Sequence, residues 1–271
     1  MINGASGIII NKNFAYIGVT NMNVNIVEML HLDLEPVGIF FGNTDAKSDL
    51  EASPEKRNCV IPFVLAAARG KVTSMNEASC TCPGGGVGAC FGDSFSRLNP
   101  NIHIMLSQGF GEKAPAEAPP MLKEGERFFC DAEVAMKWRS NMPFSDKAYP
   151  RIVFAPLSRW AEVGTPDLVY IFANADQISA LVTMQGFHNG KALNTLAPFG
   201  AACHSIVYAA EQMDKEEPYA IMGLFDISQR SIALKDYLSM TMPYKRWDIM
   251  TKDLEKSCLT THSWRKIEER L

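Results

Sequence analysis

Residues 166–184 read Pro-Asp-Leu-Val-Tyr-Ile-Phe-Ala-Asn-Ala-Asp-Gln-Ile-Ser-Ala-Leu-Val-Thr-Met, and this stretch decides the fold class. Its apolar run begins after Pro166 and ends at Asn174, which is typical of a short buried strand. From Ala175 onward the apolar residues recur at helical spacing, and Asp176 lies in the first turn, where a negative charge is favourable. A buried strand that leads directly into a helix is the building unit of an α/β fold.

The same alternation of strand and helix patterns continues on both sides of this stretch. We expect further strands over residues 36–42, 151–157, 219–224 and 238–242, and further helices over residues 23–34, 59–70, 126–141 and 247–258. The sequence therefore predicts an α/β fold with a mixed sheet and flanking helices. Each half of the chain also contains a strand followed by a Gly/Ala-rich helix start that bears a cysteine, which hints at two related lobes.

The domain organisation follows from composition along the chain. Residues 1–22 are expected to form an N-terminal extension, and residues 23–271 a single α/β domain. Its two lobes are expected to divide near residues 113–150, because residues 113–120 (Lys-Ala-Pro-Ala-Glu-Ala-Pro-Pro) are the most linker-like segment of the chain.

Charge and hydropathy exclude two classes of partner. The net charge is −4 and no run is rich in Lys or Arg, so nucleic-acid binding is not expected. No stretch approaches about 18 uninterrupted apolar residues, and the N-terminus lacks the basic region of a secretory signal, so we expect a cytoplasmic protein without a membrane partner. A redox partner, a small-molecule ligand and a homo-oligomer all stay open.

The segment of residues 79–92, Ser-Cys-Thr-Cys-Pro-Gly-Gly-Gly-Val-Gly-Ala-Cys-Phe-Gly, carries the functional argument. Because a reducing compartment disfavours disulfides, cysteines gathered on a flexible loop are better interpreted as soft metal ligands. Cys80, Cys82 and Cys90 would supply three thiolates, and a [4Fe–4S] cluster needs four. Either Cys59 or Cys203 is expected to supply the fourth.

The glycines of this segment, Gly84, Gly85, Gly86 and Gly88, are expected to present a row of backbone N–H groups. Such donors tune the potential of a bound cluster. A phosphate-binding loop of the Walker type is excluded, because no Lys-Ser/Thr pair follows the glycines. The leading hypothesis is therefore an iron–sulfur protein used for electron transfer, redox sensing or small-ligand binding.

Three alternatives to the cluster remain. A structural zinc site would use the same thiolates, although the chain has no pair of Cys-x2–4-Cys knuckles. A binding or interaction module without a cofactor would keep its cysteines reduced and buried. An enzyme could use Cys203 as a nucleophile, since a thiol at a helix N-terminus has a lowered pKa. The sequence offers no catalytic base, so whether the chain is an enzyme stays open.

Several short motifs occur in an order that resembles one known family. They are Pro36-Val37-Gly38, Cys59 at the head of an Ala-rich helix, Cys82-Pro83-Gly84-Gly85, residues 153–157 (Val-Phe-Ala-Pro-Leu), Pro166-Asp167, Asn174 with Gln177, and the turn at residues 200–203. Over roughly residues 25–255 this order resembles domain-of-unknown-function family 169, a prokaryotic family frequent in anaerobes and archaea. The resemblance implies that Cys59, Cys82 and Cys203 occupy recurring family positions, whereas Cys80 and Cys90 are additions. It implies no biochemical role.

Overall fold

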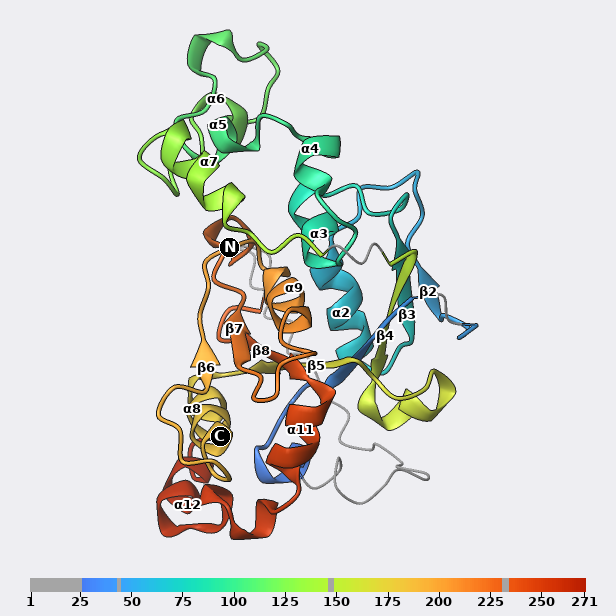
Figure 1. The fold of residues 1–271 in the computed structure, drawn as a ribbon, viewed down its shortest axis with the longest axis vertical. Helices are drawn as coiled ribbons and strands as arrows, with labels where there is room; N and C mark the ends of the chain where they lie inside the picture. The colour runs from blue at the N-terminus through green and yellow to red at the C-terminus, as the bar shows by residue number, and fades with distance from the viewer. Residues whose placement is uncertain (1–25, 43–44, 146–148, 231–233) are drawn as a thin grey trace, which may run out of the picture.

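A mixed sheet forms the centre of the molecule (Figure 1). The computed structural model describes residues 26–42, 45–145, 149–230 and 234–271. Within them the sheet has eight strands in the order β2-β3-β4-β1-β5-β8-β7-β6. The strands are β1 (Val37–Phe41), β2 (Leu50–Glu51), β3 (Thr73–Asn76), β4 (Arg151–Pro156), β5 (Leu168–Ala173), β6 (Thr195–Leu196), β7 (Ala220–Gly223) and β8 (Leu238–Pro243). Neighbouring strands are antiparallel except for the edge pairs β2–β3 and β6–β7, which are parallel. The predicted α/β class with a mixed sheet is confirmed.

The sheet consists of two halves with the same topology. The order β2-β3-β4-β1 in one half matches β6-β7-β8-β5 in the other. The register matches as well, because Val37 pairs with Pro156 as Leu168 pairs with Pro243. The halves meet where β1 and β5 run antiparallel, and Gly38 lies opposite Val169 at the middle of this pairing. An approximate two-fold axis through that point relates the halves.

In sequence, the first half of the sheet ends with β4 and the second begins with β5, so the segment 113–150 lies within the first half. The two lobes were expected to divide near this segment, residues 113–150. The expected N-terminal extension, residues 1–22, lies outside the described residues.

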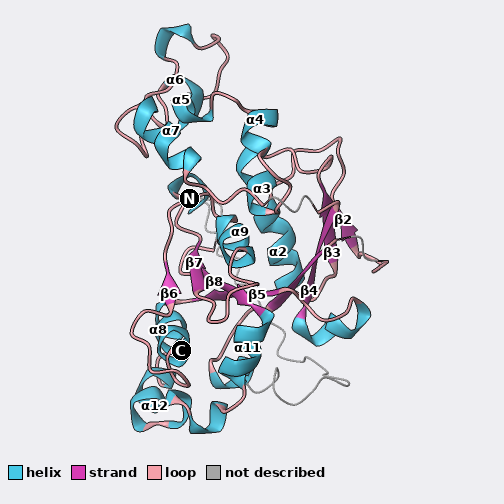
Figure 2. Ribbon diagram, viewed as in Figure 1, coloured by secondary structure: helices cyan, strands magenta, loops and turns pink. Residues whose placement is uncertain are grey.

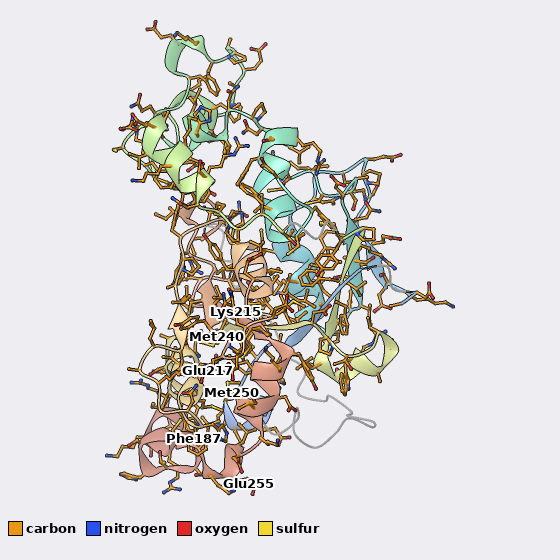
Figure 3. The ribbon with its side chains drawn as sticks, in the orientation of Figure 1. Phe187, Lys215, Glu217, Met240, Met250 and Glu255 are labelled. Atoms are coloured by element: carbon orange, nitrogen blue, oxygen red, sulfur yellow. The ribbon has the colours of Figure 1, made fainter. Side chains whose placement is uncertain are left out.

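Helices cover both faces of the sheet (Figure 2). On one face lie α2 (Val60–Ala68) and α9 (His204–Ala210), the helices that follow the edge strands of the two halves. On the other lie α8 (Ala175–Gln185), α11 (Tyr244–Thr251) and α12 (His262–Glu268). Met240 of β8 and Met250 of α11 belong to the apolar cluster between the sheet and this second layer (Figure 3). Asn174 and Gln177 form a capping box at the start of α8, which fixes where β5 ends and the helix begins.

The first half carries a helical insertion between β3 and β4, which lies beyond the end of the sheet (Figure 1). It contains α4 (Ser94–Leu98), α5 (Ile102–Leu106), α6 (Pro120–Lys123) and α7 (Ala132–Ser140). The corresponding connection of the second half, between β7 and β8, holds α10 (Ile227–Arg230). Short 3₁₀ turns occur at Gly111–Lys113, Leu157–Glu162, Leu254–Lys256 and Cys258–Thr260.

Two predicted helices were too long. The helix expected over residues 126–141 begins at Ala132, because Asp131 caps it and the N–H groups of Glu126 and Phe128 donate to carbonyls of α5 instead. The helix expected over residues 247–258 is α11, which starts at Tyr244 after Pro243 and ends at Thr251. Of the helix expected over residues 23–34, residues 26–29 are helical and residues 23–25 lie outside the described residues. Among the described residues, no helix is long and apolar enough to cross a membrane.

Candidate functional site

The glycine-rich segment forms a short helix, α3 (Pro83–Gly88), where the sequence predicts a flexible loop. Four glycines in six residues disfavour a helix, so its ends and its packing must stabilise it. Pro83 opens the first turn, and the Gly85 N–H donates to Sγ of Cys82, the N-cap residue, at 3.3 Å. At the other end the N–H of Phe91 donates to Gly86 O at 2.8 Å, and Cys90 adopts a left-handed φ of 60°. This is a Schellman termination with cysteine at the usual glycine position.

The glycines of α3 allow close packing on both sides of the helix. A Cβ on Gly86 would lie 2.4 Å from the Ser94 side chain of α4. A Cβ on Gly88 would lie 2.5 Å from Sγ of Cys203, at the start of α9. The expected row of outward N–H groups is largely used inside the helix, since the Gly86 N–H donates to Cys82 O at 2.9 Å.

Cys80 and Cys203 approach the same face of α3. A Cβ on Gly85 would lie 3.3 Å from Sγ of Cys80, and the equivalent position of Gly88 lies next to Cys203. Residues three apart on a helix share a face, with Cβ positions about 5–6 Å apart. The two thiols therefore contact neighbouring positions along one face of α3, and each is almost completely buried.

Cys59 and Cys203 are equivalent residues of the two halves. Each immediately precedes the helix that follows an edge strand, α2 in the first half and α9 in the second. Each also contacts the short helix of the opposite half: Cys203 Sγ lies 3.6 Å from Gly84 O, and Cys59 Sγ lies 3.9 Å from Oε1 of Gln229 in α10. The approximate two-fold axis thus brings both cysteines to the junction between the halves. The sequence left Cys59 and Cys203 as rival fourth ligands, whereas the structure places both at this junction.

The pKa shifts of the cysteines indicate that four of the predicted ligands lie close to one another. Burial and, to a lesser extent, the neighbouring Cys82 raise the pKa of Cys59 to about 11. Burial and the same neighbour raise the pKa of Cys80 to about 12. The pKa of Cys203 lies well above its ordinary value, because of complete burial and the proximity of Cys59, Cys82 and Cys80. We call Cys59, Cys80, Cys82 and Cys203 the cysteine cluster.

Cys90 lies apart from the cysteine cluster. Its fully buried side chain belongs to a different apolar group, with Val87, Phe95 and Val207. Its pKa is raised by burial first and by Glu211 second. The left-handed turn at the end of α3 directs the chain away from the cluster at this residue.

A cavity of about 650 Å³ adjoins the cysteine cluster through Cys82. His204 also lines it, and the hydrogen bonds of its ring fix its tautomer. The Ala201 N–H donates to Nδ1 at 3.0 Å, so Nε2 carries the proton and donates to Gly84 O at 3.0 Å. Burial lowers the pKa of His204 to about 4, so the ring is neutral at pH 7 and holds the start of α9 against α3.

The cavity has polar lining residues that were not expected as site residues from the sequence, among them Glu126, Asp226 and Gln229. The first precedes α7, and the other two lie at α10. Because about a hundred residues separate Glu126 from Asp226 in the chain, no local spacing could have joined them. Polar residues directly after the predicted strand at 219–224 were the one available signal for Asp226.

Within residues 26–42, 45–145, 149–230 and 234–271, no three Cys, His, Asp or Glu side chains are gathered closely enough to hold one metal ion. The comparison with curated proteins and the comparison with solved structures each found no match. A family model described as DUF169, uncharacterised ArCR, matches residues 25–253, which is most of the chain. The chain therefore belongs to the DUF169 family.

Proposed function

We propose that the cysteine cluster, Cys59, Cys80, Cys82 and Cys203, binds an iron–sulfur cluster of the [4Fe–4S] type. The observation that carries this proposal is the convergence of four thiols from three separate segments, around the first turns of α2, α3 and α9. A [4Fe–4S] cluster takes four thiolate ligands, commonly from distant parts of a chain.

The donor set fits such a group. The surroundings are apolar, since Cys80 and Cys203 belong to the core cluster between the sheet and helices α2 and α9. The Gly85 N–H already donates to Cys82 Sγ, which is the kind of hydrogen bond that sets the potential of an iron–sulfur centre. Without a metal, the raised pKa values of Cys59 and Cys80 keep their thiols protonated at pH 7. Incorporation of iron would replace those protons and offset the repulsion between neighbouring thiolates.

The spacing favours a cluster over a zinc ion. One zinc ion holds its four sulfurs about 3.8 Å apart, because each Zn–S bond is about 2.3 Å long. Cys80 and Cys203 contact two different residues of α3, Gly85 and Gly88, whose Cβ positions would lie about 5–6 Å apart. A larger inorganic group spans that separation without moving α3 against α9.

When bound, the cluster would accept and release single electrons. The chain's own residues would hold it, exclude water and supply hydrogen bonds to its sulfurs. Cys59 and Cys82 are partly exposed, so these two ligands would be the more accessible ones.

The same surroundings argue against Cys203 as an enzymatic nucleophile. A reactive thiol needs access and a lowered pKa. Cys203 is 3% exposed, and burial raises its pKa.

The test is anaerobic purification followed by an absorption spectrum and analysis of iron, sulfide and zinc. We expect a brown protein with about four irons and four sulfides per chain. Cys80→Ala, Cys82→Ala and Cys203→Ala should each lose most of the iron. Cys90→Ala is the matched control, because Cys90 belongs to the same segment but lies outside the cysteine cluster. The Cys90→Ala protein should keep its iron.

A colourless, metal-free protein overturns the proposal, as does zinc in place of iron. Equal iron loss in Cys90→Ala and Cys80→Ala would overturn the assignment of ligands. Circular dichroism of each variant separates a lost ligand from a lost fold.

A further inference from the structure

The cavity next to the cysteine cluster has the size of a small-molecule site. Its volume of about 650 Å³ lies within the range of ligand pockets in proteins, about 300–1,000 Å³. Residues from the helical insertion line one side, and residues from α3, α10 and the turn before α9 line the other. In Figure 1 these elements meet where the green insertion joins the body of the molecule.

One wall of the cavity is aromatic and held in place. Phe128 and Phe199 pack edge to face with ring centroids 5.5 Å apart, and Trp138 stacks on His204 at 6.3 Å. Nε1 of Trp138 donates to Phe199 O at 3.1 Å, which ties the insertion to the turn before α9. Faces of such rings attract organic cations as well as apolar groups.

Three carboxylates line the cavity: Glu55, on the exposed loop, and the more buried Glu126 and Asp226. Burial raises the pKa of Glu126, and the negative charge of Asp226 raises it further, so the two acids lie within electrostatic reach of each other. Asp226 is 7% exposed, and its Oδ1 accepts hydrogen bonds from Ser228 N at 3.0 Å and Ser228 Oγ at 2.7 Å. Among the described residues, no cation forms an ion pair with either acid.

Two basic residues, Lys56 and Arg57, line the cavity as well, on an exposed loop. Both side chains are exposed, and neither forms an ion pair with Glu126 or Asp226. Among the described residues, Glu126 and Asp226 therefore have no ion-pair partner, which is costly for a carboxylate in a partly buried site.

We propose that this cavity binds a compact organic amine with an aromatic or aliphatic body. The ammonium group would lie between Glu126 and Asp226, and the apolar body would rest against Phe128, Trp138 and Phe199. A neutral analogue would lose the charge-assisted hydrogen bonds, and an anionic analogue would be repelled. The inference does not depend on iron, although Cys82 would place such a ligand beside a bound cluster.

The experiment uses three indole probes that differ at their end groups: tryptamine, tryptophol and indole-3-acetate. Calorimetric titration of the full chain at pH 7 should show tryptamine binding about tenfold or more tightly than tryptophol, and indole-3-acetate binding most weakly. Glu126→Gln should reduce the preference for tryptamine over tryptophol at least severalfold. Glu124→Gln is the matched control, since this nearby exposed acid does not line the cavity, and it should keep the preference.

Equal affinities for tryptamine and tryptophol, no binding of tryptamine at millimolar concentration, or an unchanged preference in Glu126→Gln each overturn the inference. The titration is repeated on Cys80→Ala, which lacks one proposed iron ligand and lies outside the cavity. Retained amine binding in Cys80→Ala supports the inference independently of the iron–sulfur proposal. Loss of amine binding in Cys80→Ala would overturn the statement that amine binding does not depend on iron.

Discussion

Replacement of Gly88 by alanine tests the packing that brings α3 and α9 together. The new Cβ would lie 2.5 Å from Cys203 Sγ, 3.0 Å from Cys203 O and 3.1 Å from Cys203 C. Optimal separations between such atoms are about 3.5–4.0 Å, so α3 must move by about 1 Å. Two of the three neighbours are backbone atoms, and a side-chain rotation cannot relieve those contacts.

The magnitude follows from two opposing effects. Alanine is favoured over glycine inside a helix by about 1 kcal/mol. Overpacking costs about 1–3 kcal/mol, and the backbone contacts favour the upper end of that range. We therefore expect Gly88→Ala to lower the free energy of unfolding by about 2 kcal/mol. For a chain of this size that corresponds to a fall in Tm of about 4–8 °C.

Thermal unfolding followed by circular dichroism measures this shift. Gly84→Ala is the matched control in the same helix, because its Cβ would meet Ala201 Cβ at 3.0 Å and His204 Nε2 at 3.6 Å, without backbone contact. It should stay within about 1 kcal/mol of the unmodified chain. A Gly88→Ala protein as stable as the unmodified chain would refute the close approach of α3 to Cys203, and with it the geometry of the cysteine cluster.

Two further substitutions test the scaffold around the site. Burial raises the pKa of Glu35 more than its hydrogen bond from Ser158 N lowers it, so the contribution of Glu35 to stability is present at low pH and is lost as the pH rises through the raised pKa. Urea unfolding should therefore show that Glu35→Gln gains stability relative to the unmodified chain between pH 4 and pH 7. A difference in stability that stays constant with pH would contradict this. The buried amide of Asn58 donates to the carbonyls of Ser53 and Ser79 at 2.6 and 2.9 Å, so Asn58→Ala should lower the free energy of unfolding by about 1–3 kcal/mol in the same assay. The control Asn101→Ala, at an exposed position, should change it very little. Equal losses in the two variants would show that Asn58 does not hold these loops together.

The central strands of the sheet were predictable because the signals for them lie within a few consecutive residues. The β1 and β5 segments are short apolar runs, rich in β-branched and aromatic residues, that follow Pro36 and Pro166, and these features favour a strand over a buried helix. The start of α8 was equally local, since its capping box lies within four consecutive residues.

Helix α3 was not predictable, because its stability comes from elsewhere in the fold. Its glycines have low helix propensity, and the segment becomes helical through packing against α4 and α9. The separation of Cys90 from Cys82 follows from the same helix. On a flexible loop both could reach one metal, whereas α3 places Cys82 at its N-cap, beside the cavity, and Cys90 beyond its C-terminal end, in a separate apolar group.

The junction between the two halves explains which residues meet at the candidate site. Because β1 and β5 pair antiparallel across the approximate axis, α2 and α9 lie on one face, and each is preceded by a cysteine. The short helices that follow β3 and β7 then approach from the two sides. In the first half this helix is preceded by Cys82, and in the second by Asp226. The two halves thus present a soft donor on one side and a carboxylate on the other, and only the first half carries, among the described residues, an insertion with aromatic side chains. That difference between two otherwise matching halves places a cavity with aromatic rings and carboxylates beside a set of thiols, and each of the two features takes residues from both halves.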